Sequence, residues 1–481
     1  MHKKFLSNVI LILLLNLLVK PFYLFGVDAQ IQNSVGSEDY GMYFALLNFS
    51  FLFNILLDVG ITNYNTKHIA ESPRTVKRYI GSIIGVKVLL GFSYATFTIG
   101  SALLLGYSDQ QMGLLGILVI NQFLVSIVFY FRSNFAGLHL FKVDAILSVL
   151  DRVLLIAICL ILLYSTTIET PFQIEWFVYA QTAAYGITVL IGFILTTVKI
   201  GLPKLKINKL FVYAILKKSS PYALLILLMM LYSRIDAVML ERLLEDGKAQ
   251  AGIYAQGFRL LDAANIFALL VAGLLLPIFA RLIKQKESIV ELLQSAGKLL
   301  VGVALIVGVS CSFYAFQLMD LIYHENTANA AIAFPWIILS FIPMAATYVF
   351  GTLLTANGSL KQLNIMAASG FIINILLNFI LIPIKEAEGA AIATFSTQIF
   401  TAFWQIILVL KIFKLQLNKG SLIQIIFFTL FLVVLGLMID LESLQNIYGF
   451  LVLLIGGTIG LFAMRIIDLK LILQLVFKDR K

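Results

Sequence analysis

Residues 361–384 read KQLNIMAASGFIINILLNFILIPI, and residues 389–413 read GAAIATFSTQIFTAFWQIILVLKIF. Each run is longer than the ~20 apolar residues that a helix needs to cross a ~30 Å hydrocarbon core. Only the four residues 385–388 separate the two runs, and three of them are charged. This pattern predicts two consecutive membrane-spanning helices joined by a tight turn.

The same pattern recurs from one end of the chain to the other. The sequence is 60% hydrophobic and only 12% charged, against roughly 25% charged residues in soluble domains. A soluble protein of this size is therefore excluded. We predict an all-α membrane protein with fourteen transmembrane helices, at residues 7–27, 40–60, 78–105, 111–131, 145–164, 176–198, 219–240, 251–277, 297–319, 330–355, 361–384, 389–413, 421–439 and 447–464.

The loop charges give the orientation. With the N-terminus in the cytoplasm, 27 of the 35 Lys and Arg residues fall in cytoplasmic segments, and only Arg242, Lys248 and Lys385 in outer loops. Short cytoplasmic loops carry such an excess, so both termini are predicted to be cytoplasmic. The net charge of +10 is then explained by the orientation of the chain in the membrane, and no nucleic-acid partner is expected. The apolar N-terminal run is predicted to be a retained first helix without a signal cleavage site.

Short resemblances between the two halves predict a duplication. Tyr40-Gly41-Met42-Tyr43 is similar to Ala251-Gly252-Ile253-Tyr254, and the offset is about the length of six helices with their loops. We predict a first lobe at residues 1–200, a basic cytoplasmic linker at 201–218, a second six-helix lobe at 219–415, and two further helices with a cytoplasmic tail at 416–481. The two lobes are parallel repeats because they begin on the same side of the membrane.

Nine ionisable residues lie within the predicted spans: Lys20, Asp58, Lys87, Asp151, Arg152, Arg234, Asp236, Arg259 and Asp262. Each costs ~2.5–3.5 kcal/mol at a helix centre, so such groups face a protein interior or a watery cavity. At ~1.5 Å per residue, Lys20, Arg234 and Arg259 share one level in the outer half, whereas the residues at 58, 87, 151 and 152 lie nearer the cytoplasm.

These charges have two interpretations. Three cations at one level suit an anionic substrate, above all phosphate, which arginine binds in a bidentate manner. Lys20, Arg234 and Arg259 are therefore the candidate substrate-binding residues. The remaining six are candidate coupling or gate ion pairs, with Asp262 on the helix face of Arg259. Alternatively, some of these charges form structural ion pairs or extend their charged ends to the membrane interface.

Several kinds of active site have no counterpart in the sequence. There is no phosphate-binding glycine loop, no metal-ligand spacing among the four histidines and two cysteines, and no nucleophile motif. Transport without covalent chemistry is predicted, so the protein is not expected to be an enzyme, and no cofactor or metal is expected.

Two further stretches carry a family resemblance. Asn374 to Pro383, followed by Glu388-Gly389-Ala390-Ala391, is similar to the signature of helices 11 and 12 in polysaccharide flippases, and Leu57-Asp58-Val59-Gly60 resembles the end of their second helix. The chain thus resembles O-antigen-type flippases of the multidrug/oligosaccharidyl-lipid/polysaccharide exporter superfamily. The resemblance implies two facing lobes and a transporter that flips undecaprenyl-pyrophosphate-linked oligosaccharide from the inner to the outer leaflet of a bacterial cytoplasmic membrane by alternating access. The lipid tail would stay outside, near residues 421–464.

The resemblance also implies the partners. They are the lipid-linked oligosaccharide, membrane lipids, a proton or sodium ion as the coupling ion, and functionally a polysaccharide polymerase and glycosyltransferases; we expect a monomer. Two alternatives stay open. A multidrug antiporter of the same superfamily would export organic cations, for which a basic cavity is poorly suited. A peptidoglycan-precursor flippase would share the lipid and the mechanism, with denser basic residues expected on its first two helices.

Overall fold

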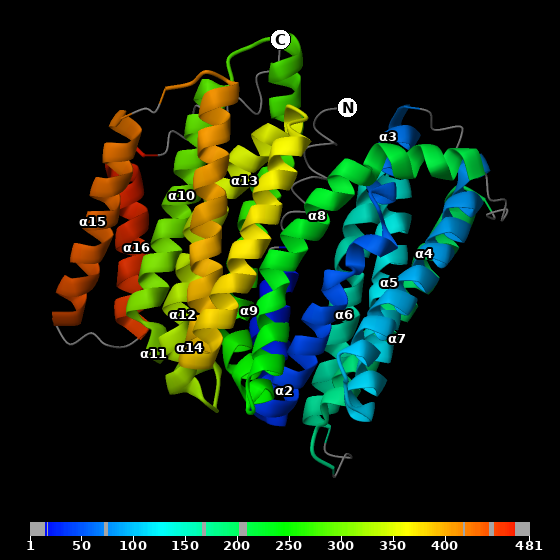
Figure 1. Ribbon diagram of the computed structural model, residues 1–481, viewed down its shortest axis with the longest axis horizontal. Coiled ribbons are helices and arrows are strands. Elements are labelled where there is room, and N and C mark those ends of the chain that lie inside the picture. Colours follow the sequence, from blue (N-terminus) through cyan, green and yellow to red (C-terminus); the bar gives the residue numbers. More distant parts are fainter. Residues whose placement is uncertain are drawn as a thin grey trace. The chain divides into compact units, whose positions relative to one another are not determined.

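The structure is a computed structural model of the 481-residue chain. It describes residues 15–16, 18–71, 76–165, 170–201, 209–416, 419–441 and 447–466. Every regular element in these ranges is a helix (Figure 1). Parts of three predicted segments lie outside the described ranges: linker residues 202–208, N-terminal residues 1–14 and tail residues 467–481.

The helices follow one another with short connections. Residues 15–16 and 18–23 are helical and lead into the first named element. The elements are η1 (Leu24–Asp28), α2 (Ala29–Leu52), η2 (Asn54–Leu57), α3 (Ile61–Glu71), α4 (Val76–Leu104), α5 (Asp109–Gly137), α6 (Phe141–Tyr164), α7 (Ile174–Lys199), α8 (Lys209–Leu243), α9 (Gly247–Gln285), α10 (Val290–Phe313), α11 (Ala315–Ile322), α12 (Thr327–Leu339), α13 (Phe341–Ala356), α14 (Leu360–Ile412), α15 (Lys419–Leu441) and α16 (Ile447–Ala463).

The predicted all-helical membrane fold is confirmed. Each of the fourteen predicted segments overlaps helical backbone, and ten helices of the described chain are long and apolar enough to cross a membrane. Large apolar side chains cover the outside of these helices, such as Phe92 at 71% and Leu104 at 91% exposure. This is the surface that a lipid environment requires. The number of fourteen membrane crossings stays a prediction.

The first helix is longer than the sequence predicts. Its predicted end is Val27, but helical backbone continues through the π-helical turn η1 and into α2, where Gly36 breaks it with φ 82° and ψ 171°. The polar residues after Val27 ended the predicted span because they do not suit lipid. In the structure they pack inside protein, since Asp28 and Gln32 are only 1% and 3% exposed.

The two apolar runs at residues 361–384 and 389–413 form the single element α14. Its backbone leaves helical geometry at Glu386, with φ 52° and ψ −129°, so two helical segments meet in the predicted tight turn. Gly389 permits this approach, because a Cβ atom there would lie 2.3 Å from the carbonyl oxygen of Leu381. No larger residue fits at this position without moving backbone.

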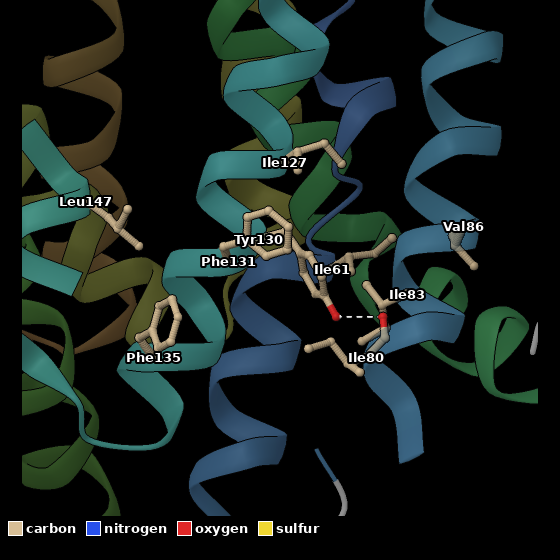
Figure 2. Packing of buried hydrophobic residues seen from close by; sticks show 9 residues of the cluster. All are labelled: Ile61, Ile80, Ile83, Val86, Ile127, Tyr130, Phe131, Phe135 and Leu147. Atoms are coloured by element: carbon tan, nitrogen blue, oxygen red, sulfur yellow. Dashed lines mark hydrogen bonds between the residues drawn. The ribbon is translucent and has the colours of Figure 1, made fainter. Parts of the chain in front are cut away.

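The chain forms two compact units, residues 1–241 and 242–481, here called unit 1 and unit 2. The predicted lobe boundaries and the duplication stay predictions. In unit 1, a buried cluster holds α3, α4, α5 and α6 together (Figure 2). The buried Tyr130 of α5 donates a hydrogen bond to the carbonyl of Ile80 on α4 at 3.0 Å. In unit 2, α10, α15 and α16 share a second apolar cluster around Leu305, Phe428 and Leu461.

Candidate functional site

A broken helix in unit 1 holds a buried lysine. After α2 the chain forms the 3₁₀ turn η2, and Val59 and Gly60 then take positive φ values of 44° and 80° before α3 begins. The break exposes the carbonyl of Leu57, which accepts hydrogen bonds from Lys87 Nζ at 3.0 Å and from Ser126 Oγ at 3.2 Å. Backbone that leaves helical geometry inside a membrane needs such replacement partners.

The same lysine pairs with Asp58. Lys87 Nζ lies 2.5 Å from Asp58 Oδ1 and donates to Ser126 Oγ at 2.9 Å. The Asp58 carboxylate also accepts from the backbone N–H and the hydroxyl of Thr62 in the first turn of α3. We call these four residues the Asp58–Lys87 network. Lys87 is 1% exposed and Asp58 29%, because the carboxylate faces a cavity of about 210 Å³.

A second cavity of unit 1, of about 90 Å³, is lined by three cations and one acid: Lys20, Arg132, Asp151 and Arg152. We call it the cationic pocket. Val125 and Phe129 of α5 line both this pocket and the cavity of the Asp58–Lys87 network, so the two cavities lie on either side of these residues. The predicted candidates Lys20, Asp151 and Arg152 are thus brought together, although the depth estimate put Lys20 at another level. The longer first helix accounts for the difference.

Aromatic side chains hold Arg152 in place. Its guanidinium carbon lies 4.8 Å from the ring centre of Tyr23 and 5.9 Å from that of Tyr185. Arg152 Nη1 donates to the Tyr185 hydroxyl at 3.1 Å, and Nε lies 3.8 Å from Asp151 Oδ2. Stacking of this kind is specific to the planar guanidinium and would not hold a lysine in the same way.

Two residues near this pocket escaped the sequence analysis. Arg132 was counted among the cytoplasmic loops, but it lies on α5, lines the pocket and donates from Nε to Asp144 Oδ1 at 2.7 Å. Asp28 falls one residue after the predicted span. Its buried carboxylate accepts from the hydroxyls of Tyr23 at 3.3 Å and Tyr40 at 2.5 Å. A search for charges up to a few residues beyond each predicted span would have found both.

The remaining candidates lie on α8 and α9. In unit 1, the Arg234 guanidinium lies 5.5 Å from the ring centre of Phe51, and Asp236 is 1% exposed. In unit 2, Arg259 Nη1 lies 3.9 Å from Asp262 Oδ2, the pair expected from their i,i+3 spacing. Arg234 belongs to unit 1 and Arg259 to unit 2. That the two residues lie at the same depth in the membrane stays a prediction.

Unit 2 contains a large apolar groove of about 660 Å³ between α10, α13, the second half of α14 and α15. Apolar side chains such as Ile342, Ile399 and Phe403 form most of its wall. Two lysines, Lys298 and Lys414, line the groove as well, and Lys298 donates to Gln424 at 2.8 Å. In the described part of the chain, no group of His, Cys, Asp and Glu residues could hold a metal ion.

The comparisons with known proteins give one family match and several structural matches. A family model described as "Polysaccharide biosynthesis protein" matches residues 5–283. No curated protein sequence gives a significant match. Among solved structures, the lipid II flippase MurJ in an inward closed conformation is similar with a TM-score of 0.67 and 15% identity, over 95% of this chain and 96% of that one.

Two further solved structures show the same architecture. An inward-facing multidrug resistance MATE transporter of the MOP superfamily has a TM-score of 0.63 at 13% identity, over 82% of this chain and 96% of its own. A MOP superfamily transporter from Pyrococcus furiosus has a TM-score of 0.60 at 14% identity, over 84% and 94%. These likenesses show the fold, which is that of MOP transporters, and the family match confirms the resemblance found in the sequence.

Proposed function

The chain belongs to the polysaccharide biosynthesis protein family, and on this premise we propose that it flips undecaprenyl-pyrophosphate-linked oligosaccharide across a bacterial cytoplasmic membrane, from the inner to the outer leaflet. Both termini lie in the cytoplasm in this proposal. The substrate has three parts with different chemistry: a long apolar tail, an anionic diphosphate and a neutral or charged sugar chain. A protein that moves it needs a surface for each part.

The apolar groove of unit 2 is the observation that carries this proposal. Its volume of about 660 Å³ falls in the range of ~300–1,000 Å³ that small-molecule sites occupy, and its wall is almost entirely apolar. A polyprenyl tail is apolar along its whole length and needs such a surface. Lys298 and Lys414 add positive charge to a groove that would receive a lipid with an acidic head. The groove includes residues of α15, where the family resemblance places the lipid tail.

Basic residues within the membrane helices support an anionic head group. Lys20, Arg234 and Arg259 are the substrate-binding residues of the proposal. In the state without substrate, Asp262 neutralises Arg259 across 3.9 Å, and an arriving diphosphate competes for the same cation. Substrate thereby changes the relative stability of two states, and such differential affinity is what alternating access requires.

The coupling ion in this proposal is a proton or a sodium ion. The ion pairs at Asp58 and Lys87, at Asp151 and Arg152, and the buried Asp236 are the candidate groups that respond to it. Each carboxylate can bind a proton or a cation in one state and its basic partner in the other. The reaction moves a lipid without making or breaking a covalent bond, so no enzymatic activity is proposed.

The test is a flipping assay in proteoliposomes with a fluorescent undecaprenyl-pyrophosphate-linked oligosaccharide. We expect Arg259→Ala to lower the flipping rate at least tenfold, because one charge-assisted contact contributes ~1.5–3 kcal/mol. Arg259→Lys should restore little, since a lysine cannot replace the planar fork. Lys385→Gln is the matched control, because Lys385 is half-exposed and, in the described part of the chain, forms its ion pair with the neighbouring Glu388. Wild-type protein that leaves this lipid in its original leaflet would refute the proposal.

A peptidoglycan-precursor flippase is the second candidate, because the structural likeness to the lipid II flippase extends over 95% of the chain. The two functions differ in cells. If the chain restores growth to cells depleted of their lipid II flippase, the second candidate holds. If its deletion removes a surface polysaccharide and leaves cell-wall synthesis intact, the first one does. A deletion that changes only resistance to cationic drugs would favour an antiporter.

A further inference from the structure

The cationic pocket gathers charge from three separate segments of unit 1. Lys20 comes from the first helix, Arg132 from α5 and Arg152 from α6. A hydrogen bond from Asn16 Nδ2 to Ser148 Oγ at 3.1 Å ties the first helix to α6 beside the pocket. The pocket is therefore formed by packing of the unit and does not depend on a loop.

Its charge is not balanced. Asp151 is the one acid in the described lining, against three cations. Asp144 pairs with Arg132 and the buried Asp28 bonds to Tyr23 beside Arg152, but neither acid is among the lining residues, so the positive excess belongs to the lining itself. Within the described residues, Lys20 makes neither a hydrogen bond nor an ion pair. Like charges at such a site repel one another unless an anion lies between them.

The donors of the two arginines are only partly used. Asp144 accepts from Arg132 Nε, and in the described part of the chain no side chain accepts from the Nη atoms of Arg132. Arg152 uses Nη1 for Tyr185, and its Nε lies 3.8 Å from Asp151. Guanidinium N–H groups remain available to donate hydrogen bonds to an oxyanion, and the rings of Tyr23 and Tyr185 already fix the plane of Arg152.

The size of the pocket limits the ligand. A volume of about 90 Å³ corresponds to roughly three water molecules at ~30 Å³ each. One tetrahedral oxyanion fills such a space, whereas a sugar ring with its hydroxyls or a prenyl chain does not. Arginine pairs and a lysine around a small cavity are the donor set that phosphate recognition uses.

We propose that Lys20, Arg132 and Arg152 form a subsite in unit 1 for one phosphate group of the transported lipid diphosphate. This inference rests on the proposed function and adds to the predicted substrate-binding residue Lys20 two arginines that the sequence places elsewhere, Arg132 in a loop and Arg152 among the gate pairs. Asp151 is the competing anion: it lies 3.8 Å from Arg152 in the empty pocket and gives way when phosphate enters. The aromatic pair at Arg152 keeps the guanidinium in its binding orientation throughout.

The experiment measures binding of three probes to the full-length protein in nanodiscs: undecaprenyl diphosphate, undecaprenol and inorganic pyrophosphate. Lys20→Gln, Arg132→Gln and Arg152→Gln should each weaken binding of the lipid diphosphate about tenfold or more, and leave binding of undecaprenol unchanged. Lys361→Gln, which removes an exposed lysine of α14, is the control and should bind as wild type. Asp151→Asn should bind the diphosphate several-fold more tightly. A gain in affinity cannot arise from misfolding.

The outcomes separate the two proposals. If wild type binds undecaprenyl diphosphate and the three Gln variants bind it equally well, the subsite is wrong and the proposed function stands. If wild type binds inorganic pyrophosphate through Lys20 and Arg152 but no lipid diphosphate, the subsite holds and the proposed function fails. If Asp151→Asn fails to strengthen binding, or wild type binds neither phosphate probe, the subsite is refuted.

Discussion

Removing the ammonium group of Lys87 should destabilise unit 1. The substitution Lys87→Met keeps the length of the aliphatic stem and deletes three interactions, to Leu57 O at 3.0 Å, Asp58 Oδ1 at 2.5 Å and Ser126 Oγ at 2.9 Å. It leaves the Asp58 carboxylate with Thr62 as its remaining hydrogen-bond donor in the described chain. An acid without its counter-charge inside a membrane protein is costly.

The magnitude follows from burial. Removing one partner of a buried ion pair costs ~3–5 kcal/mol. Because Asp58 is 29% exposed to its cavity, water reaches the carboxylate, and the lower end of that range, about 3 kcal/mol, applies. For a unit of 241 residues, each kcal/mol lowers the melting temperature by ~2–4 °C. The expected shift is therefore about 6–12 °C. The double variant Asp58→Asn/Lys87→Met removes both charges and should recover most of it.

The two native cysteines provide the assay. Cys159 lies in unit 1 and Cys311 in unit 2, and both are buried, so a thiol-reactive dye reports unfolding of each unit. In a Cys311→Ser background, the dye follows unit 1 alone. Lys142→Met, at an exposed lysine of the same unit, should melt as the background does. A Lys87→Met protein that melts within about 1 °C of the background would refute the argument, as would a double variant no more stable than the single one.

Two further predictions concern unit 2. Gly389→Ala should cost about 1–3 kcal/mol through overpacking, because its Cβ would lie 2.3 Å from the Leu381 carbonyl oxygen. Gly273→Ala, with open space around it, should not destabilise; equal melting of the two variants in a Cys159→Ser background, where the dye at Cys311 follows unit 2, would contradict this. Ile399→Trp, in the groove wall, should slow flipping several-fold in proteoliposomes, whereas Ile372→Trp, in the first half of α14 and outside the groove, should not. Equal rates would remove the groove from the transport path.

The helices were predictable because membrane insertion imposes a simple rule. An apolar run of about 20 residues must be a helix to satisfy its backbone, so the predicted segments coincide with helical backbone over most of the chain. The end of the first helix was not predictable in this way. Polar residues such as Asp28 and Gln32 can follow a lipid-facing run and still be buried, because protein, and not lipid, surrounds them there.

The candidate site was only partly predictable, and the reason is again physical. Arg259 and Asp262 share one helix face, so their ion pair follows from spacing along the sequence. Lys87 and Asp58 are 29 residues apart and meet across two elements, which no spacing on one helix reveals. Arg132 stands just past the end of a predicted span. A basic residue at this position adds to the number of positive charges on the cytoplasmic side, whether its side chain points to water or into the protein. That number therefore does not reveal that Arg132 lines a pocket.

The pattern of pairing now distinguishes charges that stabilise from charges that bind. Lys87 has a carboxylate, a hydroxyl and a carbonyl within hydrogen-bond distance, and this local compensation accounts for its presence without a bound anion. Lys20 has no such compensation in the described chain, and the pocket lining that it shares with the two arginines holds one acid against three cations. A protein gains no stability from holding three cations around one small cavity. Their convergence is consistent with selection for a transient anion, whose binding supplies the missing counter-charge once in each transport cycle.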